Sequence, residues 1–516
     1  MRNIRTLIGL CLGTIALGAC GKGGFDNICD YQGACDAPDG GGEAGDGSVL
    51  DGGPGDGGGG DVAPLGCDAS KDPKDSPACV DDTFGVFVSP TGSDTPGAGT
   101  KALPVATIAH AATLTTSAKS RVYVCEGTYP SAIALDATHD GVSIYGGFDC
   151  ASWAFASKSV KIAPAASAAA PPALTIKGFT KSASFEDLEV DAPNGTAPGD
   201  SSIAALVTGS SSITFKRVVL AAGTGVTGTS GAAGAVGTPT PADLSGINAG
   251  ATGSNADKAC TCSSGGTSTG GFGGVGPVAP AGTGDDGKIA QAVLSPAGAT
   301  GVGGTAIQCA NVTPTGGVRG SDAPTGGDAL KLTTSGKLDA TGWHPANGTT
   351  GVSGVPGQGG GGGGGAATSQ GGGGACGGCG ASGGTGGAGG GASIALAVLA
   401  STVTVNASTL STKKAGDGGG GAGGGTGQAG GARGSASGTA CNGGNGGTGG
   451  NGGAGSGGSG GIVVGVLYSG TKPTVDPGTT AAITLGGAGA AGAGGKTPAL
   501  DGKPGLTAPV QDATLL

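Results

Sequence analysis

Two stretches of the chain, Ile203–Gly223 (IAALVTGSSSITFKRVVLAAG) and Ile394–Ala415 (IALAVLASTVTVNASTLSTKKA), share the pattern that decides the fold. In each, an apolar run is followed by a short polar corner and then by alternating apolar and polar residues. The alternation is clearest at Ile213–Phe215 and Val403–Val405, and it resumes after two polar or small residues. Period-two runs separated by tight corners predict short β-strands.

The same pattern recurs along the chain at Phe185–Val190 and at Ile462–Val475. A repeat of about 20 to 30 residues indicates a solenoid, because one coil cannot bury its apolar face without a neighbour. Long insertions leave the repeat at one place, after Ala222, Lys414 and Leu485. We therefore predict an all-β parallel solenoid and keep a β-sandwich as the alternative.

The start of this region supports the solenoid through a family resemblance. Val86–Asp94 (VFVSPTGSD), Gly99–Pro104 and the Thr107-Ile108 pair resemble the opening motif of bacterial right-handed parallel β-helix proteins of the pectin-lyase-like superfamily. In that motif the Thr-Ile pair begins a capping helix, and here Thr107 is a suitable N-cap. The resemblance implies a capped β-helix part over residues 83–222 and interrupted rungs over 223–516. Ile144–Phe148 resembles a coil of glycine-rich myxobacterial surface lipoproteins.

Composition excludes several classes of protein. Of 516 residues, 124 are glycine, while aromatic residues make up 3% and charged residues 12%. A single helical domain of this size is excluded, because its core would need more large side chains. The net charge of −10 argues against a nucleic-acid partner. No apolar run is long enough to span a bilayer.

The N-terminus has the pattern of an export signal. Arg2 and Arg5 precede the apolar stretch Leu7–Leu17, and Leu17–Cys20 (LGAC) resembles the bacterial lipobox. The resemblance implies that residues 1–19 are removed and that Cys20 is acylated, which anchors the protein to a membrane. Gly21 favours the outer membrane, with the protein exposed at the cell surface. An ordinary signal peptide is the alternative.

Residues 20–82 are predicted to be a disordered acidic tether. Positions 21–81 contain twelve Asp and one Glu against three Lys, and their centre is little more than glycine and aspartate. Such a segment cannot bury apolar surface, so we expect a solvated linker. Cys29 with Cys35, and Cys67 with Cys79, are candidates for small disulfide loops at its ends.

The glycine-rich excursions have a triplet repeat. Gly443–Gly461 reads GGNGGTGGNGGAGSGGSGG, and this texture is similar to that of the mycobacterial PE-PGRS proteins. Ordering each glycine costs about 1–2 kcal/mol of backbone entropy, with few side chains to offset it. We therefore expect mobile loops, with bundled polyglycine II segments as the alternative.

Twelve cysteines follow Cys20, an even number that favours disulfides in an exported chain. Cys125 and Cys150 lie about one coil apart and are predicted to pair. The other six form two groups of three, so either one bridge joins the excursions or two thiols stay free; the pairing is open. Structural disulfides are favoured over zinc or redox chemistry at the C-G-G-C spacing, since no His lies near. These six are Cys260, Cys262, Cys309, Cys376, Cys379 and Cys441.

The densest set of ionisable residues contains two weak catalytic candidates, Asp187 and Glu189. In the coil alignment Glu186 lies on Lys216 and Asp187 on Arg217. We expect a solvated ladder of ion pairs that lowers the carboxylate pKa values, rather than a catalytic groove. No metal or cofactor is predicted.

Trp343 is a candidate for stacking on a sugar ring, although a Trp packed beneath its loop is favoured. The predicted function is a lipid-anchored cell-surface protein with a non-catalytic structural role, or an adhesive role in contact with extracellular polysaccharide. A polysaccharide lyase or hydrolase on the same scaffold is the alternative.

Overall fold

The structure, a computed structural model, describes residues 64–95, 97–167, 171–251, 255–276, 282–289, 301–305 and 316–516. The chain divides into two units, Met1–Gly60 and Asp61–Leu516, and all described residues belong to the second unit. The predicted signal peptide, Cys20, Cys29, Cys35, Cys309 and most of the predicted tether lie outside the described residues.

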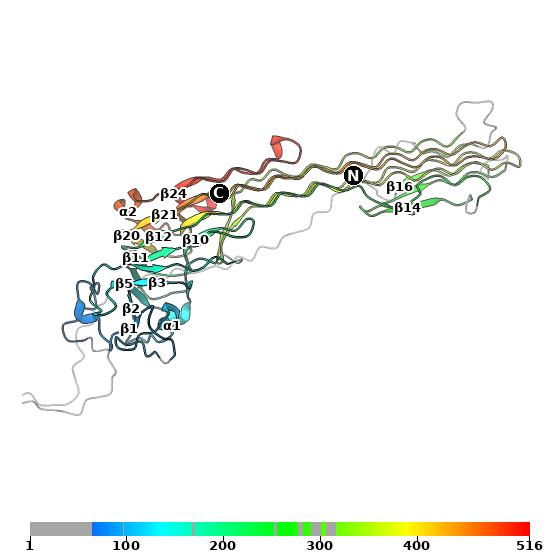
Figure 1. The fold of residues 1–516 in the computed structure, drawn as a ribbon. Coiled ribbons are helices and arrows are strands. Elements are labelled where there is room, and N and C mark those ends of the chain that lie inside the picture. The colour runs from blue at the N-terminus through cyan, green and yellow to red at the C-terminus, as the bar shows by residue number, and fades with distance from the viewer. Residues whose placement is uncertain are drawn as a thin grey trace, which may run out of the picture. The chain divides into compact units, whose positions relative to one another are not determined.

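The described part is all-β, and most of its strands belong to three parallel sheets (Figure 1). The chain visits the sheets in turn, so that β5, β6 and β7 belong to sheets A, B and C, and β8, β9 and β10 repeat that order. Sheet A comprises β1 (Gly85–Val88), β2 (Arg121–Cys125), β5 (Ser143–Phe148), β8 (Ala183–Glu186), β11 (Ile213–Lys216), β20 (Val403–Asn406) and β23 (Thr474–Val475). Sheet B comprises β3 (Gly127–Tyr129), β6 (Val160–Ile162), β9 (Glu189–Asp191), β12 (Val219–Ala221) and β21 (Thr409–Ser411). Sheet C comprises β4 (Ile133–Leu135), β7 (Leu174–Lys177), β10 (Ser202–Thr208), β19 (Ser393–Leu399), β22 (Val463–Ser469) and β24 (Thr507–Asp512).

The pairing register follows the sequence repeat. Ile203 of β10 pairs with Ile394 of β19, and Phe215 of β11 pairs with Phe185 of β8. The two phenylalanine rings lie 5.5 Å apart in the buried core. The third repeat is offset, because Ile394 pairs with Val464 and not with Ile462. A shift of two residues keeps every side chain on its predicted face.

The corners between strands use left-handed backbone. The residue after β8, β11 and β20 has a φ of 54°, 53° and 49°; these residues are Asp187, Arg217 and Ala407. The corners that follow the sheet C strands are similar, with Gly209 at 56° and Ala400 at 46°. Non-glycine residues rarely adopt this conformation, so its repetition shows that equivalent strands of one sheet are followed by the same corner geometry.

Helix α1 (Ile108–Thr113) packs against β1, β2 and β4. Thr107 is its N-cap and accepts a hydrogen bond from the His110 amide at 3.2 Å, as the sequence predicts. Asp94 holds this cap in place, because its carboxylate accepts hydrogen bonds from the Thr107 amide at 3.1 Å and the Thr107 hydroxyl at 2.8 Å. The two parts of the opening motif are therefore in direct contact.

Residues 64–82, which we call the N-terminal strap, pack against sheet A rather than continuing the tether. The Tyr123 hydroxyl donates a hydrogen bond to the carbonyl of Cys79. The Arg121 guanidinium donates one to the carbonyl of Ala69 at 2.6 Å. The Cys67–Cys79 disulfide closes the strap. Residues 64–82, which lie within the tether predicted from the sequence, are thus held on sheet A by hydrogen bonds to the carbonyls of Ala69 and Cys79.

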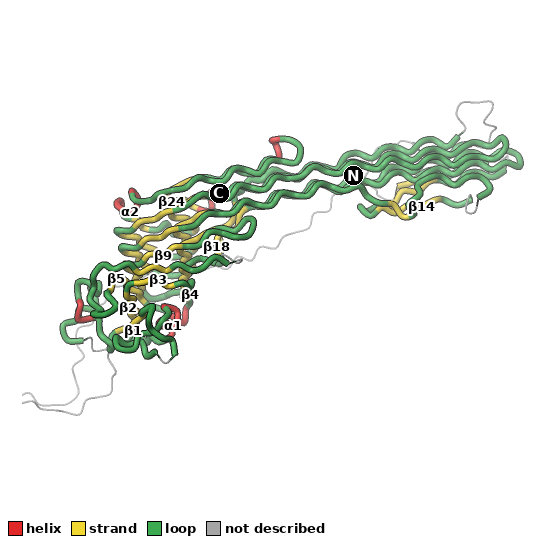
Figure 2. The backbone as a smooth tube through the Cα atoms, viewed as in Figure 1, coloured by secondary structure: helices red, strands yellow, loops and turns green. Residues whose placement is uncertain are grey.

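The glycine-rich segments form an array joined by backbone hydrogen bonds, which we call the glycine bundle. Its segments run side by side in Figure 2 and comprise residues 223–249, 316–330, 346–365, 371–391, 416–436, 442–461 and 486–495. The donors recur at every third residue: the amides of Gly378, Ala381 and Gly384 bond to the carbonyls of Gly447, Gly450 and Gly453 at 2.9–3.0 Å. Three residues per turn is the repeat of a polyglycine II type helix.

The expectation of mobile loops is therefore wrong for the described segments. An isolated glycine-rich segment has no partners for its backbone, whereas one segment here bonds to several neighbours. The amides of Gly444 and Gly446 donate to two different segments, at the carbonyls of Gly361 and Gly431, and the Gly457 amide donates to Leu500, in the turn that follows segment 486–495. Each such bond contributes about 0.5–1.5 kcal/mol net, which offsets the ordering entropy that disfavours an isolated segment.

The triplet period explains why two of every three residues are glycine. A Cβ on Gly446 would lie 1.9 Å from the Cys376 carbonyl oxygen, and a Cβ on Gly447 would lie 1.9 Å from that of Ser321. Asn445, the third member of the triplet, is exposed. With three residues per turn, Gly446 and Gly447 face neighbouring backbones, and Asn445, the third residue of the triplet, faces outward.

The remaining elements are short. A four-stranded antiparallel sheet lies beside the bundle, and a two-stranded hairpin precedes segment 346–365. Their strands are β13 (Pro239–Thr240), β14 (Lys258–Cys262), β15 (Thr267–Gly270) and β16 (Lys288–Ile289), then β17 (Gly336–Asp339) and β18 (Gly342–Pro345). The other helices are α2 (Pro477–Ala481) and the 3-10 turns Pro77–Cys79, Ala137–His139, Pro498–Leu500 and Ala513–Leu515.

Candidate functional site: a covered charge cluster

The predicted acid–base set lies at the corner between sheets A and B. Glu186 ends β8 and pairs in register with Lys216, which ends β11. Asp187 and Arg217 are the left-handed residues that follow them. The coil alignment that placed Glu186 on Lys216 and Asp187 on Arg217 is therefore confirmed.

The ion pairs differ in part from the alignment, because Arg217 binds both carboxylates. Its Nε and Nη2 donate to the two oxygens of Asp187 at 2.8 and 2.7 Å, a bidentate pair. Nη2 also donates to Glu186 Oε2 at 2.8 Å. Arg217 is thus the cation shared by the two acids, and the Lys216–Glu186 pair expected from the register is replaced.

A third carboxylate reaches the cluster from the N-terminal strap. Asp72 accepts hydrogen bonds from Lys216 Nζ at 2.6 Å and from Arg217 Nη1 at 3.1 Å. Burial acts against ionisation of Asp72, but the hydrogen bonds and charges of Lys216 and Arg217 together outweigh it and hold the pKa of Asp72 below its ordinary value. Sequence reasoning missed this partner, since more than 140 residues separate Asp72 from both cations and no local pattern connects them.

The pKa of Glu186 is raised, whereas the sequence predicts that it is lowered. The residue is only 3% exposed, so the corner is not solvated at this position. Burial, together with the nearby charge of Asp72, raises the pKa of Glu186 to about 7, and Arg217 offsets only part of this effect. The opposite charges near Glu186 are visible in the sequence, whereas the loss of water around its carboxylate is not.

The strap covers this face of sheet A. Arg121 lies between aromatic rings, with its guanidinium carbon 5.0 Å from the ring centre of Phe84 and 5.3 Å from that of Tyr145. It is 7% exposed and bonds to the strap carbonyl of Ala69. Aromatic, cationic and acidic side chains of sheet A are therefore held beneath the strap.

Sheet B carries a second set of ion pairs. Lys161 Nζ lies 3.1 Å from Glu189 and 2.9 Å from Asp191, and bonding to Asp191 and then Glu189 raises the pKa of Lys161. Asp187 and Glu189, the two weak catalytic candidates, thus each contact a cation. They line one shallow cavity of about 190 Å³ together with Lys158 and Arg217.

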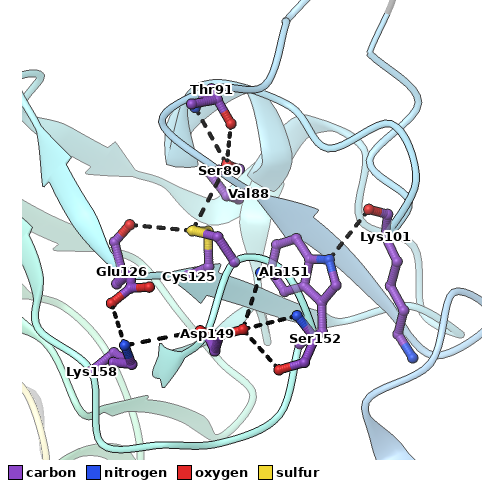
Figure 3. The surroundings of a disulfide bond; sticks show 12 residues. Val88, Ser89, Thr91, Lys101, Cys125, Glu126, Asp149, Ala151, Ser152 and Lys158 are labelled. Atoms are coloured by element: carbon purple, nitrogen blue, oxygen red, sulfur yellow. Dashed lines mark hydrogen bonds and ion pairs between the residues drawn. A yellow bond between two sulfur atoms is a disulfide. The ribbon is translucent and has the colours of Figure 1, made fainter.

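The Cys125–Cys150 disulfide predicted from the coil spacing is present, with a Cα–Cα distance of 5.0 Å. Figure 3 shows that Lys158 lies beside it, where its Nζ is 3.0 Å from Glu126 and 3.9 Å from Asp149. The Cys67–Cys79 pair is also formed. The first pair links the end of β2 to the turn after β5, and the second lies within the N-terminal strap.

The Cys376-Gly-Gly-Cys379 motif follows the repeat of three residues per turn in the glycine bundle. Cys376 pairs with Cys260 and Cys379 with Cys262, and Cys441 is disulfide-bonded as well. A spacing of three places both sulfurs on one face of segment 371–391, while a spacing of two does so on β14. At least two bridges therefore join the excursions, more than the minimum of one.

Trp343 cannot serve as a sugar platform, because it is 4% exposed and packs with Leu338 and Ile203. His344 beside it is exposed, and its Nε2 lies 3.1 Å from Asp339 and 2.8 Å from the Thr341 hydroxyl. A relay would need the carboxylate and the hydroxyl on opposite ring nitrogens. Here both contact the same nitrogen, so this trio is not a nucleophilic triad.

One larger cavity, of about 650 Å³, opens beside α1 and is lined by His139, Asp140 and several hydroxyl side chains. Its histidine is held by Asp136, whose carboxylate lies 3.1 Å from Nδ1. Asp140 is used structurally, since it accepts bonds from the amides of Thr180 and Lys181. The cavity therefore offers one oriented imidazole and hydroxyl groups.

Within the described ranges, no His, Cys, Asp or Glu side chains are grouped in a way that would hold a metal ion. No helix in that part of the chain has the length and apolar character needed to cross a bilayer. Comparison of the chain with family models, curated proteins and solved structures found no match.

Proposed function

We propose that the chain is a lipid-anchored protein of the bacterial outer-membrane surface, with a structural role or an adhesive role toward extracellular polysaccharide. Its body is proposed to be a right-handed parallel β-helix of the pectin-lyase-like type. The three parallel sheets visited in turn support the helix, and the opening motif at Val86–Asp94 supports the family. The LGAC sequence at Leu17–Cys20 supports the anchor.

The observation that carries a non-catalytic role is the use of the acids in the charge cluster. Arg217 binds Asp187 and Glu186, and the strap residue Asp72 closes the cluster from outside. A catalytic acid must reach its substrate, whereas Glu186 is buried beneath the strap. The glycine bundle instead provides surface, with small side chains such as Thr229 and Ser230 exposed.

The anchor is tested by replacing Cys20 with serine. Serine cannot receive the acyl chains, so we expect the Cys20→Ser protein to move from the membrane fraction to the soluble fraction and to lose fatty-acid labelling. Cys11→Ser, within the predicted signal, is the matched control and should stay membrane-bound. Full membrane association of the Cys20→Ser protein would contradict the anchor.

The raised pKa of Glu186 favours a second candidate function, a polysaccharide lyase or hydrolase. A carboxyl with a pKa of about 7 beside a carboxylate paired to arginine is an arrangement that acid catalysis uses. We nevertheless expect the purified protein to release no reducing ends or unsaturated uronides from pectin, alginate or peptidoglycan, with or without calcium. Turnover that is lost in Asp187→Ala or Glu189→Ala, and kept in Asp75→Ala, would establish the enzyme instead.

A further inference from the structure

The groove between segments 416–436 and 442–461 has a known occupant over part of its length. Segment 486–495 lies in it: the amides of Gly418 and Gly421 donate to the carbonyls of Ala490 and Ala493 at 2.9 and 2.7 Å. The occupant bonds to the other wall as well, where Gly492 N–H donates to the Gly458 carbonyl. A glycine- and alanine-rich backbone is therefore the ligand that this groove accepts.

Beyond Gly495 the chain turns back, but the row of amides continues at the same spacing. Asparagine side chains accept from three of these amides. The amides of Gly427, Arg433 and Ala436 donate to the Oδ1 atoms of Asn451, Asn445 and Asn442, at 2.8, 2.9 and 2.8 Å. Past the turn, the asparagine side chains of segment 442–461 thus accept the hydrogen bonds that carbonyls of segment 486–495 accept before it.

The third residue of each triplet in 442–461 changes at this point. Where segment 486–495 and its return lie in the groove, that residue is Gly457 or Gly460, and a Cβ there would meet the Gly492 or Gly489 carbonyl oxygen at 1.9 or 2.2 Å. Past the turn it is Asn451, Thr448 or another asparagine. Glycine at this position leaves room for the backbone of another segment. Asparagine at this position fills that room with its side chain.

We infer that Asn442, Asn445 and Asn451 close a docking groove that would otherwise accept a glycine-rich segment from a second copy of this chain. The groove is continuous with the interface that segment 486–495 already uses, and a second copy presents backbone of the same kind. An open edge of unpaired amides invites association, and the asparagine acceptors on the amides of Gly427, Arg433 and Ala436 remove three donors from that edge. The asparagines are therefore specificity determinants of this surface.

The test replaces all three asparagines with glycine in the full chain, which gives the outer groove the composition of the inner one. We expect the N442G/N445G/N451G protein to self-associate about tenfold more tightly or better in sedimentation velocity than the unmodified protein. It should also bind a synthetic peptide of residues 484–495. The matched control changes the exposed Thr426, Ala429 and Ala432 to glycine and should do neither.

A second variant separates docking from simple weakening. Alanine at the three asparagines removes the acceptors but keeps a Cβ in the groove. Faster hydrogen exchange at Gly427, Arg433 and Ala436 with no self-association is therefore expected. Equal association of the alanine and glycine variants would overturn the proposal, and so would a glycine variant that neither self-associates nor binds the peptide. Retained exchange protection of segment 371–391 shows that each variant is folded.

Discussion

Alanine in place of Gly419 is expected to lower the free energy of unfolding by about 3 kcal/mol, the upper range for overpacking. A Cβ at this residue would lie 1.9 Å from the carbonyl oxygen and 2.5 Å from the carbonyl carbon of Thr229. Both are backbone atoms, so no side-chain rotation relieves the contact. Either segment 223–249 moves away, or the Gly419 amide loses its 2.8 Å bond to Ala388.

The next residue provides the matched control. A Cβ on Gly420 would have the Ala493 carbonyl oxygen as its nearest neighbour, at an ordinary 3.6 Å. Gly420→Ala is therefore expected to be neutral, or to stabilise by about 0.4–1 kcal/mol through the unfolded chain. Urea denaturation of both proteins, with hydrogen exchange at Gly228 and Gly231, makes the comparison. Equal stabilities would mean that the segments are not packed as described.

Methionine in place of Arg217 is expected to cost about 3–5 kcal/mol of stability, as when one partner of a buried ion pair is removed. The change leaves Glu186 buried without a cation and Asp187 without its bidentate partner. Lys216 alone would remain against Asp72. Lys414→Met is the control, because Lys414 is well exposed and 3.6 Å from Asp417, so its loss should cost less than about 1 kcal/mol.

The pH dependence of this effect follows from Glu186. Its pKa of about 7 in the folded protein exceeds the ordinary value of 4.5, so its contribution to stability is full below 4.5 and is lost as the pH rises through 7. Asp72, with a lowered pKa, contributes above its ordinary value, and this contribution is lost as the pH falls through the lowered pKa.

Without Arg217 the pKa of Glu186 should rise further. The destabilisation should therefore be largest above about pH 7 and should shrink as Glu186 takes up a proton. Thermal denaturation of Arg217→Met and the unmodified protein across this pH range measures it. A stability difference that stays constant with pH would show that Glu186 is not the buried charge at issue.

The strands and their register could be predicted because their information is local. The alternation at Ile213–Phe215 and Val403–Val405 indicates which face of each strand is buried. The repeat in the sequence indicates which strand is the hydrogen-bonded partner. The corner residues Asp187 and Arg217 followed from the same alignment. These features depend on neighbours in sequence or on the equivalent position one repeat away.

The glycine bundle and the strap could not be predicted in the same way. Gly419 is constrained by Thr229, and Arg217 by Asp72, and no local pattern connects either pair. The Asn445 side chain has its role only because segment 486–495 ends before reaching it. The glycine content indicates a large entropic cost of ordering the chain. The carbonyls that accept hydrogen bonds from each segment belong to segments far away in the sequence.

Native-state hydrogen exchange over segment 442–461 tests the central claim, that the glycine-rich excursions are an ordered part of the fold, most directly. The bundle predicts that the amides of Gly446, Gly449 and Gly452, each bonded at 2.8–3.0 Å to segment 416–436, exchange about as slowly as those of β10 and β19. Exchange of these three amides at the rate of an unstructured peptide, with β10 and β19 still protected, would contradict it.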